Sequence, residues 1–207
     1  MFADGFSSWQ ARENIKKFIS PIPKAKTNPE YQKKGLNCCV SSWQRIHDNA
    51  LPPRIKCGAN YINSRLAQLE ALDNGYDTVI FLNHHGNVAE GPGSCLFMVR
   101  DNTLITPLLT DSVLESITRD TVITLAKELG INVTERTVDR TELYLCDEAF
   151  LCGSAMEITP VVSVDHYTVG DGTEGTVTNI LHRAYLQTVN GETQAHMDWL
   201  TEIYEHE

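Results

Sequence analysis

The sequence of 207 residues lacks an excess of basic side chains. It has 17 Lys and Arg against 27 Asp and Glu, which gives a formal net charge of −10 and a pI of about 5.1. This balance argues against nucleic acid or an anionic membrane surface as the main partner. The chain also lacks an apolar run long enough to cross a bilayer. The sequence therefore predicts neither a nucleic-acid partner nor a membrane partner.

Paired cysteine motifs and a secretory signal are also missing. None of the six cysteines forms a CxxC pair, and their scattered positions are not typical of a disulfide framework. Residues 1–9 contain the acidic Asp4 and no apolar segment of the kind that a secretory signal requires. Buried thiols in a reducing cytosol are the simplest interpretation, so we expect a cytoplasmic protein.

What the sequence does contain is the composition of an ordinary globular protein, with 42% hydrophobic and 21% charged residues. Its length allows one large domain or two small ones. Residues 1–34 include Pro21, Pro23 and Pro29 and predict an extended N-terminal arm. We expect one domain over residues 35–191 and a polar C-terminal tail over residues 192–207.

Hydrophobic periodicity predicts short strands that outnumber the helices. Ile62, Leu66, Leu69 and Leu72 recur at helical spacing and indicate an amphipathic helix, which Gly75 would end. The expected strands cover residues 37–43, 78–82, 95–99, 103–106, 131–138, 149–152, 161–164 and 167–169, and two more helices follow near residues 122–129 and 178–189. Because these elements do not form regular βαβ repeats, we expect an α+β fold. Its sheet would be mixed, strongly curved and pseudo-barrel-like, with flanking helices.

Four loops at strand or helix ends carry the candidate functional groups. They are Lys56–Tyr61, Glu90–Ser94, Ser116–Thr118 and Gly153–Ala155. A lysine can form a Schiff base with an aldehyde, an acid can pair with a cationic ring nitrogen, and a helix start favours a phosphate. These are the parts that pyridoxal phosphate (PLP) needs, and the combination is more informative than any single member.

Each loop also has a plainer interpretation that its residues alone leave open. Lys56 is typical of a solvated surface lysine, and Glu90 of a turn carboxylate in water. Ser116 fits simple N-capping, which a phosphate role does not exclude. The segment Gly153–Ala155 fits a tight turn. The adjacent His84 and His85 are more typical of a surface turn than of a metal site, so we expect no metal.

Over residues 35–191 the chain resembles the large C-terminal domain of class IV (fold type IV) PLP-dependent aminotransferases, above all the branched-chain amino acid aminotransferases. The runs that carry the resemblance are Lys56–Tyr61, Ala89–Ser94 with Leu96–Phe97, Leu114–Asp120, Asp147–Phe150 and Gly153–Val161. The resemblance implies transamination between branched-chain L-amino acids and 2-oxoglutarate, with an amino acid and a 2-oxo acid as small-molecule substrates. It also implies a homodimer.

The resemblance further implies roles for single residues. Lys56 would hold PLP as a Schiff base and then shuttle a proton between the substrate Cα and the cofactor. Tyr61 would hydrogen-bond the phenolic oxygen of PLP. Glu90 would keep the pyridine nitrogen protonated, and Leu114 would pack on the ring.

Phosphate and carboxylate binding complete the implied site. Ile117 and Thr118 at the helix start, together with the Ser154 hydroxyl, would hold the phosphate. The backbone of Ser154 and Ala155 would bind the α-carboxylate of the substrate.

The chain also departs from the family pattern. Ser116, Cys95 and Ser154 stand where the family usually has Gly, Asn and Thr, and Met156 replaces a usual Ala. We expect most of the small N-terminal domain of the family to be missing, which leaves open a catalytically impaired PLP-binding or interaction remnant. D-amino acid aminotransferases and aminodeoxychorismate lyases share the fold, but the segment Glu157–Pro160 favours the branched-chain enzymes.

Overall fold

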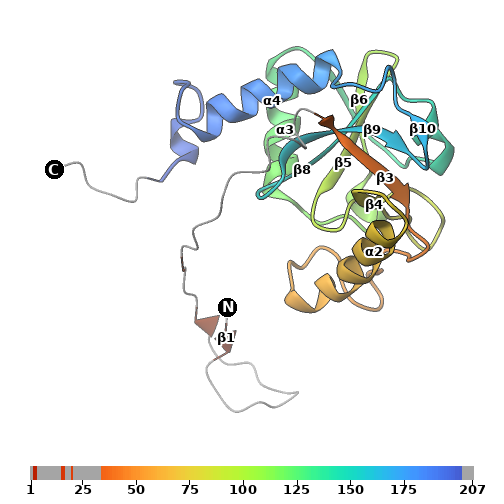
Figure 1. Cartoon of the computed structure of the whole chain (residues 1–207). Coiled ribbons are helices and arrows are strands. Elements are labelled where there is room, and N and C mark those ends of the chain that lie inside the picture. The colour runs from red at the N-terminus through yellow and green to blue at the C-terminus, as the bar shows by residue number, and fades with distance from the viewer. Residues whose placement is uncertain (1, 4–14, 17–19, 21–33, 202–207) are drawn as a thin grey trace.

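The computed structural model describes residues 2–3, 15–16, 20 and 34–201 (Figure 1). Most of the expected N-terminal arm (1–34) and the end of the expected tail (192–207) therefore lie outside the described residues. Within the arm, β1 (Phe2–Ala3) and β2 (Ile15–Lys16) form a short antiparallel pair. Among the residues that the structure describes, no helix is both long and apolar enough to span a membrane.

The core of the fold is a mixed eight-stranded sheet with the strand order β4-β3-β9-β8-β5-β6-β7, in which β10 pairs with β9. Its strands are β3 (Leu36–Val40), β4 (Thr78–Ile80), β5 (Cys95–Arg100), β6 (Thr103–Thr106), β7 (Asn132–Glu135), β8 (Glu148–Gly153), β9 (Glu157–Val164) and β10 (Tyr167–Thr168). β3 runs parallel to β4 and β9, and β6 runs parallel to β7, whereas β8 is antiparallel to β5 and β9. The expected α+β class with a mixed sheet is confirmed.

In the part of the chain that the structure describes, three α-helices flank the sheet: α2 (Tyr61–Asp73), α3 (Ile117–Glu128) and α4 (Thr176–Val189). Short 3-10 helices lie in the connections at η1 (Gly58–Asn60), η2 (Leu109–Asp111) and η3 (Arg140–Tyr144), and η4 (Met197–Trp199) follows α4. The strand expected over residues 37–43 ends at Val40, and the strand expected at residue 161 already begins at Glu157. These boundary errors arise because pairing across the sheet, rather than local apolarity, decides where a ladder starts and stops.

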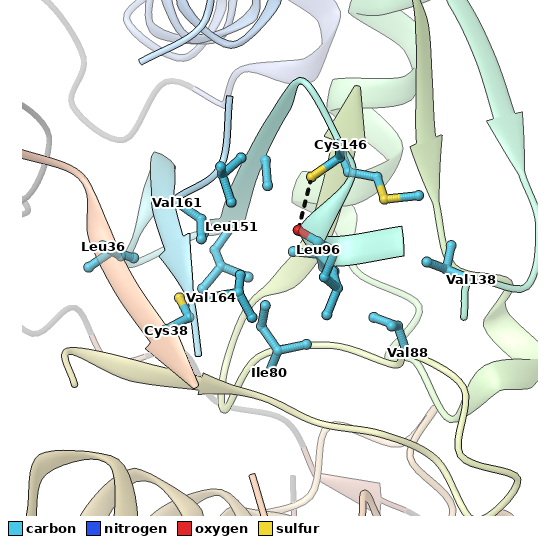
Figure 2. Packing of buried hydrophobic residues seen from close by; sticks show 14 of the residues in the cluster. Leu36, Cys38, Ile80, Val88, Leu96, Val138, Cys146, Leu151, Val161 and Val164 are labelled. Carbon is cyan, nitrogen blue, oxygen red and sulfur yellow. Dashed lines mark hydrogen bonds between the residues drawn. The ribbon is translucent and has the colours of Figure 1, made fainter. Parts of the chain in front are cut away.

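Alternation along β5 and β8 divides the core into two layers. Cys95, Phe97 and Phe150 face the layer that includes α3 and α4, and the two phenylalanine rings stack at 5.1 Å. Leu96 and Leu151 point to the opposite layer, which side chains of β3, β9 and the loop around η3 fill (Figure 2). The sheet therefore buries both faces of its central strands.

The helix α2 forms where the periodicity predicts it, and Gly75 beyond its end has the left-handed φ of 79°. Its orientation, however, differs from that of an ordinary amphipathic helix. The large apolar side chains are exposed: Ile62, Leu66, Leu69 and Leu72. The buried residues of α2 are instead small, namely Ser64, Ala67 and Ala71. Small side chains let the helix axis approach the buried Val79 and Phe81 closely.

Candidate active site

A cavity of about 280 Å³ lies where the four candidate loops meet. This volume is close to the lower end of the usual range for ligand pockets, about 300–1,000 Å³. Six of the residues singled out in the sequence line it together: Lys56, Tyr61, Glu90, Leu114, Ile117 and Ser154. Two others do not line it. Thr118 is buried in the first turn of α3, where its side chain contacts Tyr185, and Ala155 lies in the turn just beyond Ser154.

Glu90 forms the buried wall of this pocket. It is only 3% exposed. Arg45 donates to Glu90 Oε1 from both Nε and a terminal nitrogen at 2.8 Å, while the Leu114 N–H donates to Oε2 at 3.2 Å. Burial raises the pKa of Glu90, and the charge of Arg45 opposes this rise. The Cys95 thiol lies 3.8 Å from Oε2, and burial raises its pKa to about 12, so it remains a protonated donor.

Arg45 is a pocket residue that the sequence did not reveal. Its side chain is buried, its backbone N–H donates to the Leu82 carbonyl at 2.8 Å, and its guanidinium also donates to Asn63 at 3.3 Å. It stands in no recognisable motif. Its partner Glu90 is 45 residues away in sequence, so only the fold brings the two charges together.

Lys56 also lines the pocket, from an exposed loop before η1. The Cys57 N–H donates to the Ile55 carbonyl at 2.8 Å and closes a three-residue turn with Lys56 at its centre. Tyr61 begins α2 directly after η1 and is 47% exposed. The lysine and the phenol therefore both line the pocket and are exposed to solvent.

The start of α3 supplies a third group. Ser116 is the N-cap, and its hydroxyl accepts a hydrogen bond from the Arg119 N–H at 3.3 Å, as the capping interpretation predicted. The N–H groups of Ile117 and Thr118 belong to the first helical turn, where no intrahelical acceptor is available. This end of the helix carries a partial positive charge and suits a phosphate group.

Two glycine loops close the pocket beside Ser154. A Cβ at Gly153 would lie 3.0 Å from the Gly93 carbonyl oxygen, so the two backbones approach closely. The Met156 N–H donates to the Gly153 carbonyl at 3.0 Å and forms the expected tight turn. Ser154 is thereby held at the tip of a compact turn between β8 and β9.

The neighbouring histidines form a surface cluster. The rings of His84 and His85 are 3.8 Å apart, and those of His47 and His84 are 5.2 Å apart. Within the described part of the chain, no group of His, Cys, Asp and Glu side chains has an arrangement that could hold a metal ion.

Comparison with known sequences places these observations in a family context. The family model for amino-transferase class IV matches residues 4–164. A probable branched-chain-amino-acid aminotransferase from Aquifex aeolicus is 46% identical over 173 residues, which are 83% of this chain and 56% of that protein. The branched-chain-amino-acid aminotransferase of Escherichia coli K12 is 45% identical over 174 residues, 84% of this chain and 56% of that protein.

Solved structures agree with the sequence relatives. The branched-chain amino acid aminotransferase of Thermobaculum terrenum in its PLP form matches with a TM-score of 0.82 and 53% identity, over 85% of this chain and 58% of that one. The Escherichia coli enzyme matches with a TM-score of 0.85 and 43% identity, over 88% and 60%. The chain thus spans a little over half the length of the relatives that it matches.

Proposed function

The chain belongs to the class IV aminotransferase family, and from this premise we propose that it carries the PLP-binding domain of a branched-chain amino acid aminotransferase. In this proposal residues 35–191 form that domain, and the reaction exchanges the amino group between a branched-chain L-amino acid and 2-oxoglutarate. The observation that carries the proposal is the pocket itself, which combines an accessible lysine, a buried ion-paired carboxylate and a helix N-terminus.

The donor set of this pocket fits PLP. Arg45 engages Glu90 Oε1, whereas Oε2 receives one backbone N–H at 3.2 Å and a weak thiol donor at 3.8 Å. A carboxylate has about four acceptor sites, and these four donors fill them. The thiol is the weakest of the four and also lies 3.9 Å from the Leu114 carbonyl, so the protonated ring nitrogen would take its place at Oε2. The first turn of α3 suits the phosphate, and the Ser154 hydroxyl adds a polar group beside it.

PLP, when bound, supplies an electron sink that stabilises negative charge at the substrate Cα. The residues of this chain would then orient and protonate. The Lys56 amine would bind the cofactor aldehyde covalently and later carry a proton between the substrate Cα and the cofactor. Glu90 would hold the proton on the ring nitrogen, because an ionised carboxylate beside that nitrogen favours its protonated form.

The remaining pocket residues would position the ligands. Tyr61 would donate to the phenolic oxygen of the cofactor, and Leu114 would pack against its ring. The backbone N–H groups of Ile117 and Thr118 would hold the phosphate, and those of Ser154 and Ala155 the substrate carboxylate. Thr118 would act through its backbone, which agrees with a buried side chain that does not line the pocket.

Covalent labelling tests the cofactor assignment directly. The purified chain is mixed with PLP, its visible absorbance is recorded, and borohydride then fixes the carbon–nitrogen bond for peptide mass analysis. We expect one dominant pyridoxyl label, on Lys56, and its loss in Lys56→Ala. No absorbance change and no label at Lys56 would contradict the proposal.

Adding L-leucine and 2-oxoglutarate to the loaded chain tests the reaction. Formation of glutamate supports the aminotransferase assignment, and D-alanine as amino donor separates it from the D-amino acid enzymes of the family. A labelled chain without turnover would identify a PLP-binding remnant instead.

We further propose that the chain forms a homodimer through the exposed apolar face of α2. Ile62, Leu66, Leu69 and Leu72 are 40–66% exposed along one helix, and apolar patches of this kind are typical of interfaces. The face begins beside Tyr61, which lines the pocket, so the proposed interface adjoins the candidate active site. Light scattering during size-exclusion chromatography tests this. We expect a dimeric mass that falls to the monomer in Leu69→Glu, and a monomeric parent chain would refute it.

The cysteines support a cytoplasmic location. All six lie in the described residues as free thiols, and five of them are buried. Unpaired thiols of this kind are typical of proteins in reducing compartments.

A further inference from the structure

Asn60 is a buried polar residue between two exposed segments, and none of the roles assigned above uses it. It is only 5% exposed, whereas the preceding Gly58 and Ala59 and the nearby Lys56 are exposed. Its side chain lines the pocket. A buried amide in an otherwise exposed loop needs a physical reason, because removing its dipole from water costs free energy unless hydrogen bonds replace the water.

The reason lies in the loop that precedes Lys56. The side-chain nitrogen of Asn60 donates to two backbone carbonyls, that of Pro52 at 3.1 Å and that of Ile55 at 2.8 Å. The Ile55 carbonyl also accepts the Cys57 N–H, which closes the turn centred on Lys56. The Asn60 amide nitrogen therefore links the start of the loop, at Pro52, to the turn that carries Lys56.

The orientation of this amide is fixed by its surroundings. Turning it over would place its oxygen against two carbonyl oxygens, which repel it. In the observed orientation Oδ1 is buried and finds no hydrogen-bond partner among the described residues. The site thus tolerates one unsatisfied acceptor in order to keep both donated hydrogen bonds.

The other contacts of this loop are local turn hydrogen bonds and one ion pair. The Ile55 N–H donates to the Pro52 carbonyl at 3.3 Å, and the Asn60 N–H donates to the Cys57 carbonyl at 3.1 Å. The ion pair between Arg54 and Glu115 joins it to the segment before α3 at 2.7 Å, but the two side chains are 38% and 55% exposed. Water screens such surface pairs, and they contribute little to stability. The buried Asn60 amide is therefore the stronger constraint on the backbone of Lys56.

We propose that Asn60 is a positioning residue that holds the Lys56 turn in place, so that the amine meets a cofactor aldehyde in a fixed geometry. The role rests on the proposed function, because it concerns the lysine to which that function assigns the covalent bond. Asn60 itself touches neither the aldehyde nor the substrate in this role. Only a group with two N–H donors on one atom can satisfy both carbonyls at once.

Substitutions that remove the donors one at a time test this role. Asn60→Ser keeps one donor, and Asn60→Asp keeps the shape but replaces the donors with a carboxylate. Asn74→Asp is the matched control, because Asn74 donates to the Glu70 carbonyl at 2.8 Å at the exposed end of the same helix. Circular dichroism confirms that each variant compared is folded.

Two measurements are made on these chains. The first is the rate of pyridoxyl labelling at Lys56 relative to that at the exposed Lys127, measured by borohydride trapping and peptide mass analysis. The second is the rate of trypsin cleavage after Arg54 and Lys56 in the absence of PLP. Loss of two hydrogen bonds of about 1 kcal/mol each lowers the population of the ordered loop by roughly 10–30-fold. We expect labelling to slow and cleavage to accelerate in the order Asn, Ser, Asp.

The outcomes are separable. If Lys56 of the parent chain is not labelled, the proposed function fails, while trypsin cleavage still tests the loop. If the parent is labelled and folded Asn60→Asp matches Asn74→Asp in both measurements, the positioning role is wrong.

Discussion

Glu90 and Lys56 line the same pocket, but the Glu90 side of its wall is buried and the Lys56 side is an exposed loop. Glu90 is 3% exposed and forms an isolated β-bridge with Cys95, and Arg45 binds it through two nitrogens at 2.8 Å. Lys56 lies in an exposed loop whose backbone depends on a turn and on the Asn60 amide. A buried ion pair holds Glu90 in place, whereas hydrogen bonds from the turn and from the buried Asn60 amide hold the exposed loop of Lys56.

This difference follows from what each wall would do in the proposed reaction. A carboxylate that pairs permanently with a ring nitrogen works best where water cannot compete, because a low dielectric strengthens the pair. An amine that forms and releases a covalent bond needs access and some freedom. The contrast leads to distinct expectations for stability and for chemistry when either wall is altered.

Removing the amine is the largest expected change in chemistry. Lys56→Ala deletes both the covalent attachment and the proton carrier, so we expect transamination to fall by about 10³-fold or more. Because the side chain is exposed, the free energy of unfolding should change by only about 0.5 kcal/mol. Steady-state kinetics and urea unfolding measure the two effects, with Lys127→Ala as the control lysine. Retained turnover in Lys56→Ala would show that another residue binds the cofactor and transfers the proton.

Removing the charge behind Glu90 should instead affect stability and cofactor binding together. Arg45→Met leaves a buried carboxylate unpaired, which costs about 3–5 kcal/mol. Burial already raises the pKa of Glu90, so the folded state binds a proton more readily than the unfolded state. Stability therefore falls as pH rises through this pKa. The loss in Arg45→Met should be largest at neutral and alkaline pH and smaller in acid, as urea titrations over a pH series would measure.

The double variant Arg45→Met with Glu90→Gln sharpens this test. Replacing both partners removes the unpaired charge, so stability should recover by most of the loss in Arg45→Met. PLP affinity, followed by absorbance, should stay low because the ring nitrogen then lacks its carboxylate. Equal stability of Arg45→Met and the parent chain would show that the ion pair between Arg45 and Glu90 does not stabilise the fold.

The sequence was most informative where chemistry sits in short local motifs. Lys56, Glu90 and Ser154 each stand in a recognisable run, and all three line one pocket. The cap at Ser116 was also predicted, because capping depends on residues within one helical turn. Their roles toward a cofactor remain predictions.

What the sequence did not reveal depends on contacts distant in the chain. Arg45 acquires its meaning only from Glu90, and the Glu148 carboxylate caps α4 by accepting the Thr178 N–H at 2.7 Å, 30 residues away. The sequence also did not show which face of α2 packs against the sheet. Its leucines suggested a face for burial, but the small Ala67 and Ala71 occupy the contact with the sheet. Periodicity gives the helix and not the neighbour against which it packs.

Ion pairs outside the pocket show how little a partly exposed pair contributes to stability. Altering them gives the smallest expected effect. The Glu142 carboxylate contacts Arg136 at 2.6 Å and Arg100 at 3.3 Å, and the arginines are 38% and 36% exposed. The bond to Arg136 lowers the pKa of Glu142 from 4.5 to about 2. The stabilisation is present above the ordinary pKa and is lost as pH falls from about 4.5 to 2.

Because water screens the exposed arginines, we expect Glu142 to contribute only about 1 kcal/mol. Glu142→Gln should lower the free energy of unfolding by that amount at pH 7 and by much less near pH 2, where about half of Glu142 is protonated in the folded state. Urea unfolding at the two pH values would measure both losses. Asp101→Asn serves as the control, since its carboxylate is 96% exposed and lies 4.0 Å from Arg100. A loss in Glu142→Gln as large as that in Arg45→Met would remove the distinction between buried and exposed pairs on which the comparison of the two walls depends.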